Sequence, residues 1–196
     1  MSAPSAYVIR GGEEGRKRLE ILARVMWPAT YQLLKRAGTC AGMTVLDMGC
    51  GGGDVTRGIA RLVGPEGRVV GCDMDGVKLD AARREAALQG LVNLEFRQAN
   101  IYDFADESAY DRIYARFLLT HLPDCPGALA RMRRALRPGG VLIVEDIDFT
   151  GRSAIRPTRR TRATSSYTAK WFAGGRAIRT SDPGCMACSP KQGCNR

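Results

Sequence analysis

Hydrophobic and polar residues follow two rhythms along this chain, and these predict strands and helices in alternation. Short apolar runs with the length of buried parallel strands lie at residues 44–48, 68–73, 92–97, 110–115 and 141–146. Apolar residues at helical spacing lie between them, at residues 53–63, 76–89 and 125–136. Regular alternation of strands and helices is typical of an α/β fold. We therefore expect a Rossmann-like, mostly parallel sheet with helices on both faces.

A further helical pattern precedes the first strand. Apolar residues recur at helical spacing from Arg16 to Ala37, with Pro28 inside the run. Proline removes one helical hydrogen bond, so we expect either a kink or two successive helices there. Residues 1–15 are polar and glycine-rich, and we expect a flexible N-terminal segment before a domain that spans residues 16–150.

The stretch with the strongest chemical signal joins the first strand to its helix. Val45–Asp54 reads Val-Leu-Asp-Met-Gly-Cys-Gly-Gly-Gly-Asp, an apolar strand that runs into glycines. Glycine allows the backbone to turn sharply and to approach a ligand closely, because it has no Cβ. A strand, a glycine loop and a helix in this order form a nucleotide-binding element at the carboxyl edge of a sheet.

Charge indicates which nucleotide fits this loop. The dinucleotide pattern G-x-G-x-x-G fails because Asp54 or Thr56 stands where the third glycine is needed, and no Lys follows as in a phosphate loop. Carboxylates flank the turn at Asp47 and Asp54, where they would repel a pyrophosphate but suit a cationic ligand. S-adenosylmethionine, with a sulfonium, an ammonium and no phosphate, is such a ligand.

The segment Val45–Gly53 resembles motif I of the class I S-adenosylmethionine-dependent methyltransferases. Further blocks that match this family in order and spacing lie at residues 69–75, 110–115, 121–124 and 136–144. The resemblance covers roughly residues 16–150 and implies methyl transfer from S-adenosylmethionine. In such proteins an N-terminal segment covers the cofactor, although residues 16–37 are equally consistent with simple packing on the sheet.

Asp73 ends the second strand, where a carboxylate can accept hydrogen bonds from both ribose hydroxyls. The alternative is that Asp73 or Asp75 only caps the next helix, and we assign capping to Asp75 and ribose binding to Asp73. By resemblance, Met74 and Ile101 would flank the adenine. Asn100 stands where the family usually has an acid that contacts the adenine amino group, and its side-chain carbonyl can accept the same hydrogen bond.

The resemblance also implies contacts to the methionine moiety of the cofactor. The glycines would let the backbone approach it, and the carboxylate of Asp47 would orient the loop and face the ammonium. The segment that begins at Arg116 would line the same end. The residues expected here are Asp47, Gly49, Cys50, Gly51, Gly53 and Arg116.

Catalytic residues are not fixed by the pattern, because displacement from a sulfonium can proceed largely through alignment of the reactants. His121, the only histidine, is a candidate general base, but it is more readily explained as a positional family residue that hydrogen-bonds the loop. Asp146 is the second candidate, among the acids Glu145, Asp146 and Asp148 near the end of the fifth strand. Acids at this place are more often solvated loop residues. We expect no metal site.

The net charge of +10 is unevenly distributed. Residues 151–196 contain ten Lys and Arg against one acid, so residues 1–150 carry only about +1. A near-neutral domain argues against nucleic-acid binding and favours a small-molecule methyl acceptor. No apolar run is long enough to span a membrane, and seven cysteines without a regular framework suggest reduced thiols in a cytoplasmic protein.

Residues 151–196 break the pattern and form a basic tail with neither helical nor strand periodicity. We therefore expect the family's C-terminal strands 6 and 7 to be missing, with strand 5 as an exposed edge. Out-of-frame translation of a GC-rich gene would explain this composition, and a nucleic-acid-binding arm or a zinc site at Cys185, Cys188 and Cys194 are weaker alternatives.

The pattern as a whole predicts in-line methyl transfer from S-adenosylmethionine to a small molecule, by analogy with quinone-type and other small-metabolite methyltransferases. Three alternatives stay open: a module that binds the cofactor without turnover, an inactive or truncated remnant of such an enzyme, and a nicotinamide-dependent oxidoreductase. The sequence does not identify the acceptor or the oligomeric state.

Overall fold

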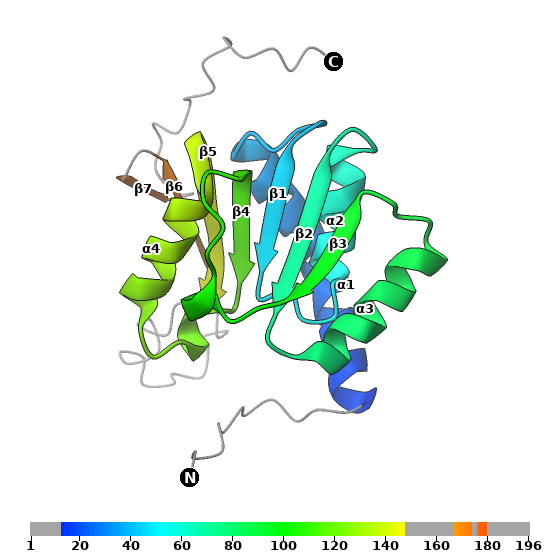
Figure 1. The fold of residues 1–196 in the computed structure, drawn as a ribbon. Coiled ribbons are helices and arrows are strands. Elements are labelled where there is room, and N and C mark those ends of the chain that lie inside the picture. The colour runs from blue at the N-terminus through cyan, green and yellow to red at the C-terminus, as the bar shows by residue number, and fades with distance from the viewer. Residues whose placement is uncertain (1–12, 148–166, 174–175, 180–196) are drawn as a thin grey trace, which may run out of the picture.

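The computed structural model describes residues 13–147, 167–173 and 176–179, and it forms a three-layer α/β unit (Figure 1). The elements, in chain order, are α1 (Glu13–Arg36), β1 (Thr44–Met48), α2 (Asp54–Val63), β2 (Arg68–Asp73), α3 (Gly76–Leu88), β3 (Leu94–Gln98), η1 (Ile101–Asp103), β4 (Tyr110–Arg116), η2 (Leu119–His121), α4 (Cys125–Ala135), β5 (Leu136–Ile147), β6 (Tyr167–Ala173) and β7 (Arg176–Arg179). Among the described residues, no helix is long and apolar enough to cross a membrane.

The sheet has the order β3-β2-β1-β4-β5-β6-β7. Strands β1 to β5 pair in parallel, which confirms the predicted Rossmann-like fold. The chain leaves β1 in one direction for β2 and β3 and later returns to place β4 on the other side of β1. Such a reversal of strand order opens a crevice at the carboxyl ends of the strands, where ligands bind in this class of fold.

Side chains from alternate strand positions fill the two faces of the sheet. Val45 and Val69 pack with α1 and α2 on one face, whereas Leu46 and Val70 pack with α4 on the other. In Figure 1, α4 lies in front of the sheet and α1 and α2 lie behind it. The apolar strands are therefore covered on both sides, as parallel sheets require.

The prediction that strands 6 and 7 are missing is wrong. β6 pairs antiparallel with β5, in a register that aligns Phe172 with Leu142 and Tyr167 with Ile147, and β7 pairs antiparallel with β6. The exposed edge expected at β5 is therefore covered. Backbone groups make the hydrogen bonds between strands, and these bonds do not require apolar and polar side chains to alternate. The lack of alternation in residues 151–196 was therefore a poor guide to whether strands form there. The stronger signal was the dipeptide Gly174–Gly175 between two short segments, which is typical of a hairpin.

The structure also differs from the sequence pattern in several smaller features. α1 is one helix across the exposed Pro28, so the two-helix alternative is wrong. Val77 belongs to the apolar pattern of residues 76–89 but is 81% exposed, and β5 begins before the apolar run at 141–146, because it includes residues 136–140. Of the predicted flexible N-terminus, residues 1–12 lie outside the described residues, as do the three cysteines considered as zinc ligands. The boundaries of the predicted domain and tail stay predictions.

Candidate functional site

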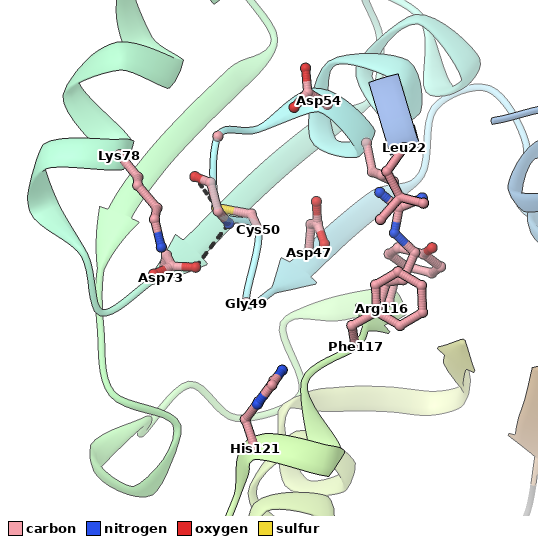
Figure 2. Close-up of a pocket in the computed structure, with 14 residues that line it drawn as sticks. Leu22, Asp47, Gly49, Cys50, Asp54, Asp73, Lys78, Arg116, Phe117 and His121 are labelled. Atoms are coloured by element: carbon pink, nitrogen blue, oxygen red, sulfur yellow. Dashed lines mark hydrogen bonds between the residues drawn. The ribbon is translucent and has the colours of Figure 1, made fainter. Parts of the chain in front are cut away.

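A cavity opens at the carboxyl ends of β1, β2 and β4, where the strand order reverses (Figure 2). The structure brings together there seven of the residues predicted from the sequence. These are Asp47, Gly49, Cys50, Gly51, Asp73, Arg116 and His121. Figure 2 shows Asp73 and Lys78 on one side of the glycine loop and Asp47 and Arg116 on the other. α1 adds Leu22, so the N-terminal helix does border this cavity.

The glycine loop is tied to the neighbouring strand by its own backbone. The N–H groups of Gly49 and Cys50 both donate to the Cys72 carbonyl, at 2.8 and 3.0 Å, and the N–H of Gly51 donates to Asp73 Oδ2 at 2.8 Å. Gly49 and Gly51 have φ values of +77° and +54°, which side chains with a Cβ rarely adopt. Because these three N–H groups are already bonded, they are not free donors of the kind that a phosphate loop presents to its ligand.

Asp73 is positioned by two backbone donors. Its Oδ2 accepts from Gly51, and its Oδ1 accepts from the N–H of Asp75 at 2.9 Å. Each carboxylate oxygen retains acceptor capacity, because an ionised carboxylate has about four lone-pair sites. Asp75 instead caps α3 by accepting from the N–H groups of Val77 and Lys78, which confirms the capping role predicted for it.

Asp47 is a buried carboxylate at the end of β1, only 2% exposed. Thr56 Oγ1 donates to its Oδ2 at 2.6 Å. Burial raises the pKa of Asp47 from its ordinary value of 3.8 to about 6, although the Thr56 hydrogen bond and the positive charge of Arg116 act in the opposite direction. The chain therefore holds an acid at this place at an electrostatic cost, which is characteristic of functional sites.

The C-terminal part of the loop is held by packing and by an arginine that sequence reasoning missed. Gly53 has φ +74°, and a Cβ there would lie 2.6 Å from Phe96 Cζ, so the constraint on this glycine is the packing of β3. The buried Arg57 donates to the Gly52 carbonyl at 2.9 Å and to Asp54 Oδ1 at 2.6 Å. The spacing of Asp54 and Arg57, three residues apart at the start of a helix, was the available signal.

The end of β4 and the residue after it contribute two side chains to the lining of the cavity. Phe117 has φ +53°, an unusual value for a bulky residue, and its N–H donates to the Glu145 carbonyl at 2.9 Å. The Arg116 guanidinium lies 5.6 Å from the centre of the Phe117 ring. Arg116 Nη1 is buried and has no hydrogen-bond partner in the described part of the chain. Both residues line the cavity.

The acids at the end of β5 are more ordered than expected. Glu145 is 5% exposed, and its Oε2 accepts from Tyr114 Oη at 2.5 Å and from Thr30 Oγ1 at 2.8 Å, so it is not a solvated loop residue. Asp146 accepts from the N–H and the hydroxyl of Thr120, both at 3.3 Å, and does not line the cavity. His121 does line it, with an exposed side chain.

Gly53, Asp146 and the three residues predicted to border the adenine lie outside the lining of this cavity. Met74 is 63% exposed, and Ile101 is 4% exposed within the core beside α4. Asn100 Oδ1 accepts from the N–H of Tyr102 at 3.0 Å and caps η1. Met74 directly follows β2, which ends at Asp73, and Asn100 and Ile101 follow the end of β3. The predicted contacts of these three residues with adenine stay predictions.

The comparisons with known proteins agree on one protein family. A family model for a methyltransferase domain matches residues 40–186. A ubiquinone/menaquinone biosynthesis C-methyltransferase of Hahella chejuensis is 40% identical over 135 residues, which cover 65% of this chain and 54% of that protein. A trans-aconitate 2-methyltransferase of Azoarcus sp. is 37% identical over 151 residues, which cover 76% of this chain and 56% of that protein. The chain thus spans about half the length of these curated relatives.

Solved structures agree with the family model. A crystal structure of a SAM-dependent methyltransferase from Aquifex aeolicus aligns with a TM-score of 0.58 at 26% identity and covers 65% of this chain and 68% of that one. The family model itself reaches beyond residue 150, into the segment that contains β6 and β7.

Proposed function

The chain belongs to the S-adenosylmethionine-dependent methyltransferase family, and from this premise we propose that it transfers the methyl group of that cofactor to a small-molecule acceptor. The observation that carries the proposal is the Asp73 carboxylate, held by the N–H groups of Gly51 and Asp75 at the end of β2. A carboxylate fixed in this way can accept from two neighbouring ribose hydroxyls at once.

The charges around the cavity fit this cofactor. The lining side chains include three carboxylates, Asp47, Asp54 and Asp73, against Lys78 and Arg116. S-adenosylmethionine has two positive groups and one negative group, so a lining with more acids than bases favours it. A dinucleotide, with its two phosphates, would meet the same acids with repulsion, which argues against an oxidoreductase.

The proposed roles follow from these positions. Asp73 binds the ribose, and Asp47 faces the ammonium, while Gly49, Cys50, Gly51 and Gly53 shape the loop against the methionine moiety. Arg116 borders the same end. Met74, Asn100 and Ile101 are proposed neighbours of the adenine.

The cofactor supplies a methyl group on a sulfonium, which is already a good leaving group. The chain's contribution is then to hold the acceptor in line with that methyl group and to exclude water. Where the acceptor must lose a proton, His121 is the better candidate base, because it lines the cavity and Asp146 does not.

A small-molecule acceptor is supported by two observations. The Hahella and Azoarcus relatives are named for small-molecule methylation. Residues 1–150 carry a net charge of only about +1, which gives little net electrostatic attraction for nucleic acid.

The test is to incubate the full chain with S-adenosylmethionine labelled in its methyl group and with a panel of quinols and carboxylic acids, and then with RNA and protein. Label is expected in the small-molecule fraction and is expected to be lost in Asp73→Asn. Label in RNA or protein alone would contradict the proposal.

A second candidate function is cofactor binding without methyl transfer. It is favoured by the limited alignment with the Hahella relative, which covers 54% of that protein, so its acceptor-binding parts need not have counterparts here. Saturable binding of S-adenosylhomocysteine together with no label in any fraction would favour this alternative.

A further inference from the structure

The outer surface of α1 carries exposed apolar side chains beside the cavity. Ile21 and Val25 are 61% and 72% exposed, and Leu22 between them in sequence lines the cavity. With about 3.6 residues per helical turn, Val25 falls between Ile21 and Leu22 around the helix axis. The three side chains therefore form one continuous apolar strip, which we call the α1 strip, and it runs from the cavity onto the outer surface of the helix.

The α1 strip is separate from the face that packs α1 on the sheet. That face carries Met26 and Leu34, which are 8% and 0% exposed. Around the helix axis the strip lies between this buried face and the exposed Arg24. A surface helix normally turns polar residues outward beyond its packed face, so an additional exposed apolar arc indicates contact with something outside the fold.

The position of the α1 strip relative to the cofactor distinguishes it from the other exposed apolar residues. Figure 2 shows Leu22 with Asp47 and Arg116, away from Asp73. If Asp73 binds the ribose, as proposed above, the adenosine occupies the Asp73 end, and the strip borders the opposite end. Two other exposed apolar residues, Met74 and Val77, follow Asp73 at the adenosine end, and the remaining two, Leu88 and Val92, lie at the far end of α3.

The cavity wall next to the α1 strip suits the reacting end of an apolar molecule. Phe117 lies on this side of the cavity, with its ring centre 5.6 Å from the Arg116 guanidinium (Figure 2). His121, the candidate base, also lines the cavity. A flat group could therefore contact the Phe117 ring inside the cavity while an attached apolar chain continues over Leu22 onto the strip.

We propose that the α1 strip binds an apolar chain of the methyl acceptor, so that the acceptor is an amphipathic small molecule with its reacting group in the cavity. This inference rests on the proposed function, because it names the substrate class of the same cavity. The occupant is a small molecule rather than a protein surface, because the strip is continuous with the cavity lining through Leu22.

The test compares two probes that differ only in chain length, 4-ethylphenol and 4-hexylphenol. Calorimetry measures their binding to the full chain saturated with S-adenosylhomocysteine. A completely buried methylene group increases affinity about fourfold, so one that rests on a surface with water on its other side increases it about twofold. The four additional methylene groups of 4-hexylphenol are therefore expected to give roughly 16-fold tighter binding.

Two double variants place this gain on the molecule. Ile21→Gln with Val25→Gln removes the exposed part of the strip and is expected to reduce the gain to about threefold or less. The matched control, Leu88→Gln with Val92→Gln, removes the exposed apolar pair at the far end of α3 and is expected to keep the full gain. All four positions are exposed, and glutamine favours helix more than isoleucine or valine does, so the strip variant is expected to fold.

The single histidine of the chain shows whether the probes enter the cavity. His121 lines the cavity, so its imidazole NMR signals are expected to shift when either phenol binds to the full chain. Unshifted signals with saturable binding of 4-hexylphenol would mean that the probe adsorbs outside the cavity, and this would overturn the inference.

The inference is also overturned if the two probes bind equally, if neither binds, or if the strip variant keeps the gain. It fails equally if the strip is shown to serve another partner. Loss of binding to phosphatidylcholine vesicles in the strip variant would identify a bilayer, and conversion of a dimer to a monomer would identify a second copy of the chain. In all these cases S-adenosylhomocysteine still binds, whereas failure of the proposed function means that it does not.

Discussion

Replacing Asp47 by Asn is expected to stabilise the fold while weakening cofactor binding. In the wild-type chain Thr56 Oγ1 donates to Asp47 Oδ2 at 2.6 Å. The Asn side chain has the same shape, and its carbonyl can still accept this hydrogen bond. What disappears is a buried negative charge, on a residue that is only 2% exposed. The cost of that charge is visible in the pKa of Asp47, which burial raises from 3.8 to about 6.

The sign and size of the effect follow from proton linkage. Between about pH 4 and pH 6 the folded chain holds a proton on Asp47 that the unfolded chain has released, so its free energy of unfolding falls as the pH rises through this window. Above it, the difference between the two pKa values corresponds to about 3 kcal/mol. Asp47→Asn removes this loss, so the gain is about 3 kcal/mol at most at pH 8 and about half of that at pH 5.

The assay is urea unfolding of the ligand-free full chain and of Asp47→Asn at pH 5 and pH 8. Asp80→Asn, which removes an exposed acid on α3, is the matched control and is expected to change stability by less than about 0.5 kcal/mol. If the gain in stability is equal at both pH values, or if stability is lost at pH 8, then the buried charge of Asp47 does not destabilise the fold.

Binding is expected to change in the opposite direction. If Asp47 faces the ammonium, Asp47→Asn replaces a charge-assisted contact by a neutral one and weakens S-adenosylhomocysteine binding roughly 10- to 100-fold. Wild-type binding is likewise expected to weaken as the pH falls below about 6, because Asp47 must then release a proton. A stabilised variant that loses its ligand would identify Asp47 as a functional residue kept at the expense of stability.

Further predictions concern the loop and the buried acid of β5. Gly51→Ala is expected to fold at a backbone cost of about 1–2 kcal/mol in urea unfolding, because its φ is +54° and its Cβ would meet no atom within 4 Å. Gly53→Ala, at φ +74°, is expected to lose about 1–3 kcal/mol more, because its Cβ would lie 2.6 Å from Phe96 Cζ. Equal stability of the two variants would contradict this packing. Glu145→Leu leaves the Tyr114 hydroxyl without its acceptor and is expected to lose about 2–4 kcal/mol, while Glu145→Gln, which keeps an acceptor, is expected to lose less by the same assay.

The parallel sheet was predictable because buried strands are continuous apolar runs, and each of the five runs became a strand of β1–β5. The assignment of capping to Asp75 was predictable for a related reason. A residue two positions past the end of a strand lies where the next helix begins. The hairpin of β6 and β7 was not predicted, because it is defined by backbone pairing with β5 rather than by a hydrophobic pattern.

The candidate site was predictable as a set of positions but not as a set of contacts. The glycine loop and Asp73 could be placed from spacing alone. The burial of Glu145 could not, because its partner Thr30 lies 115 residues away in the sequence. The burial of Arg116 Nη1 without a partner could not be predicted either, because it is set by how β4 ends and by the hydrogen bond that holds the next turn.

The most direct test of the whole account is calorimetric titration of S-adenosylhomocysteine into the full chain, beside Asp73→Asn and the matched variant Asp80→Asn. The account predicts saturable binding at one site per chain, retained in Asp80→Asn and weakened at least tenfold in Asp73→Asn, because the ribose loses its charged acceptor. Equal affinity in all three proteins, or no binding to a folded, monodisperse chain, would contradict the assignment of the cofactor to this cavity.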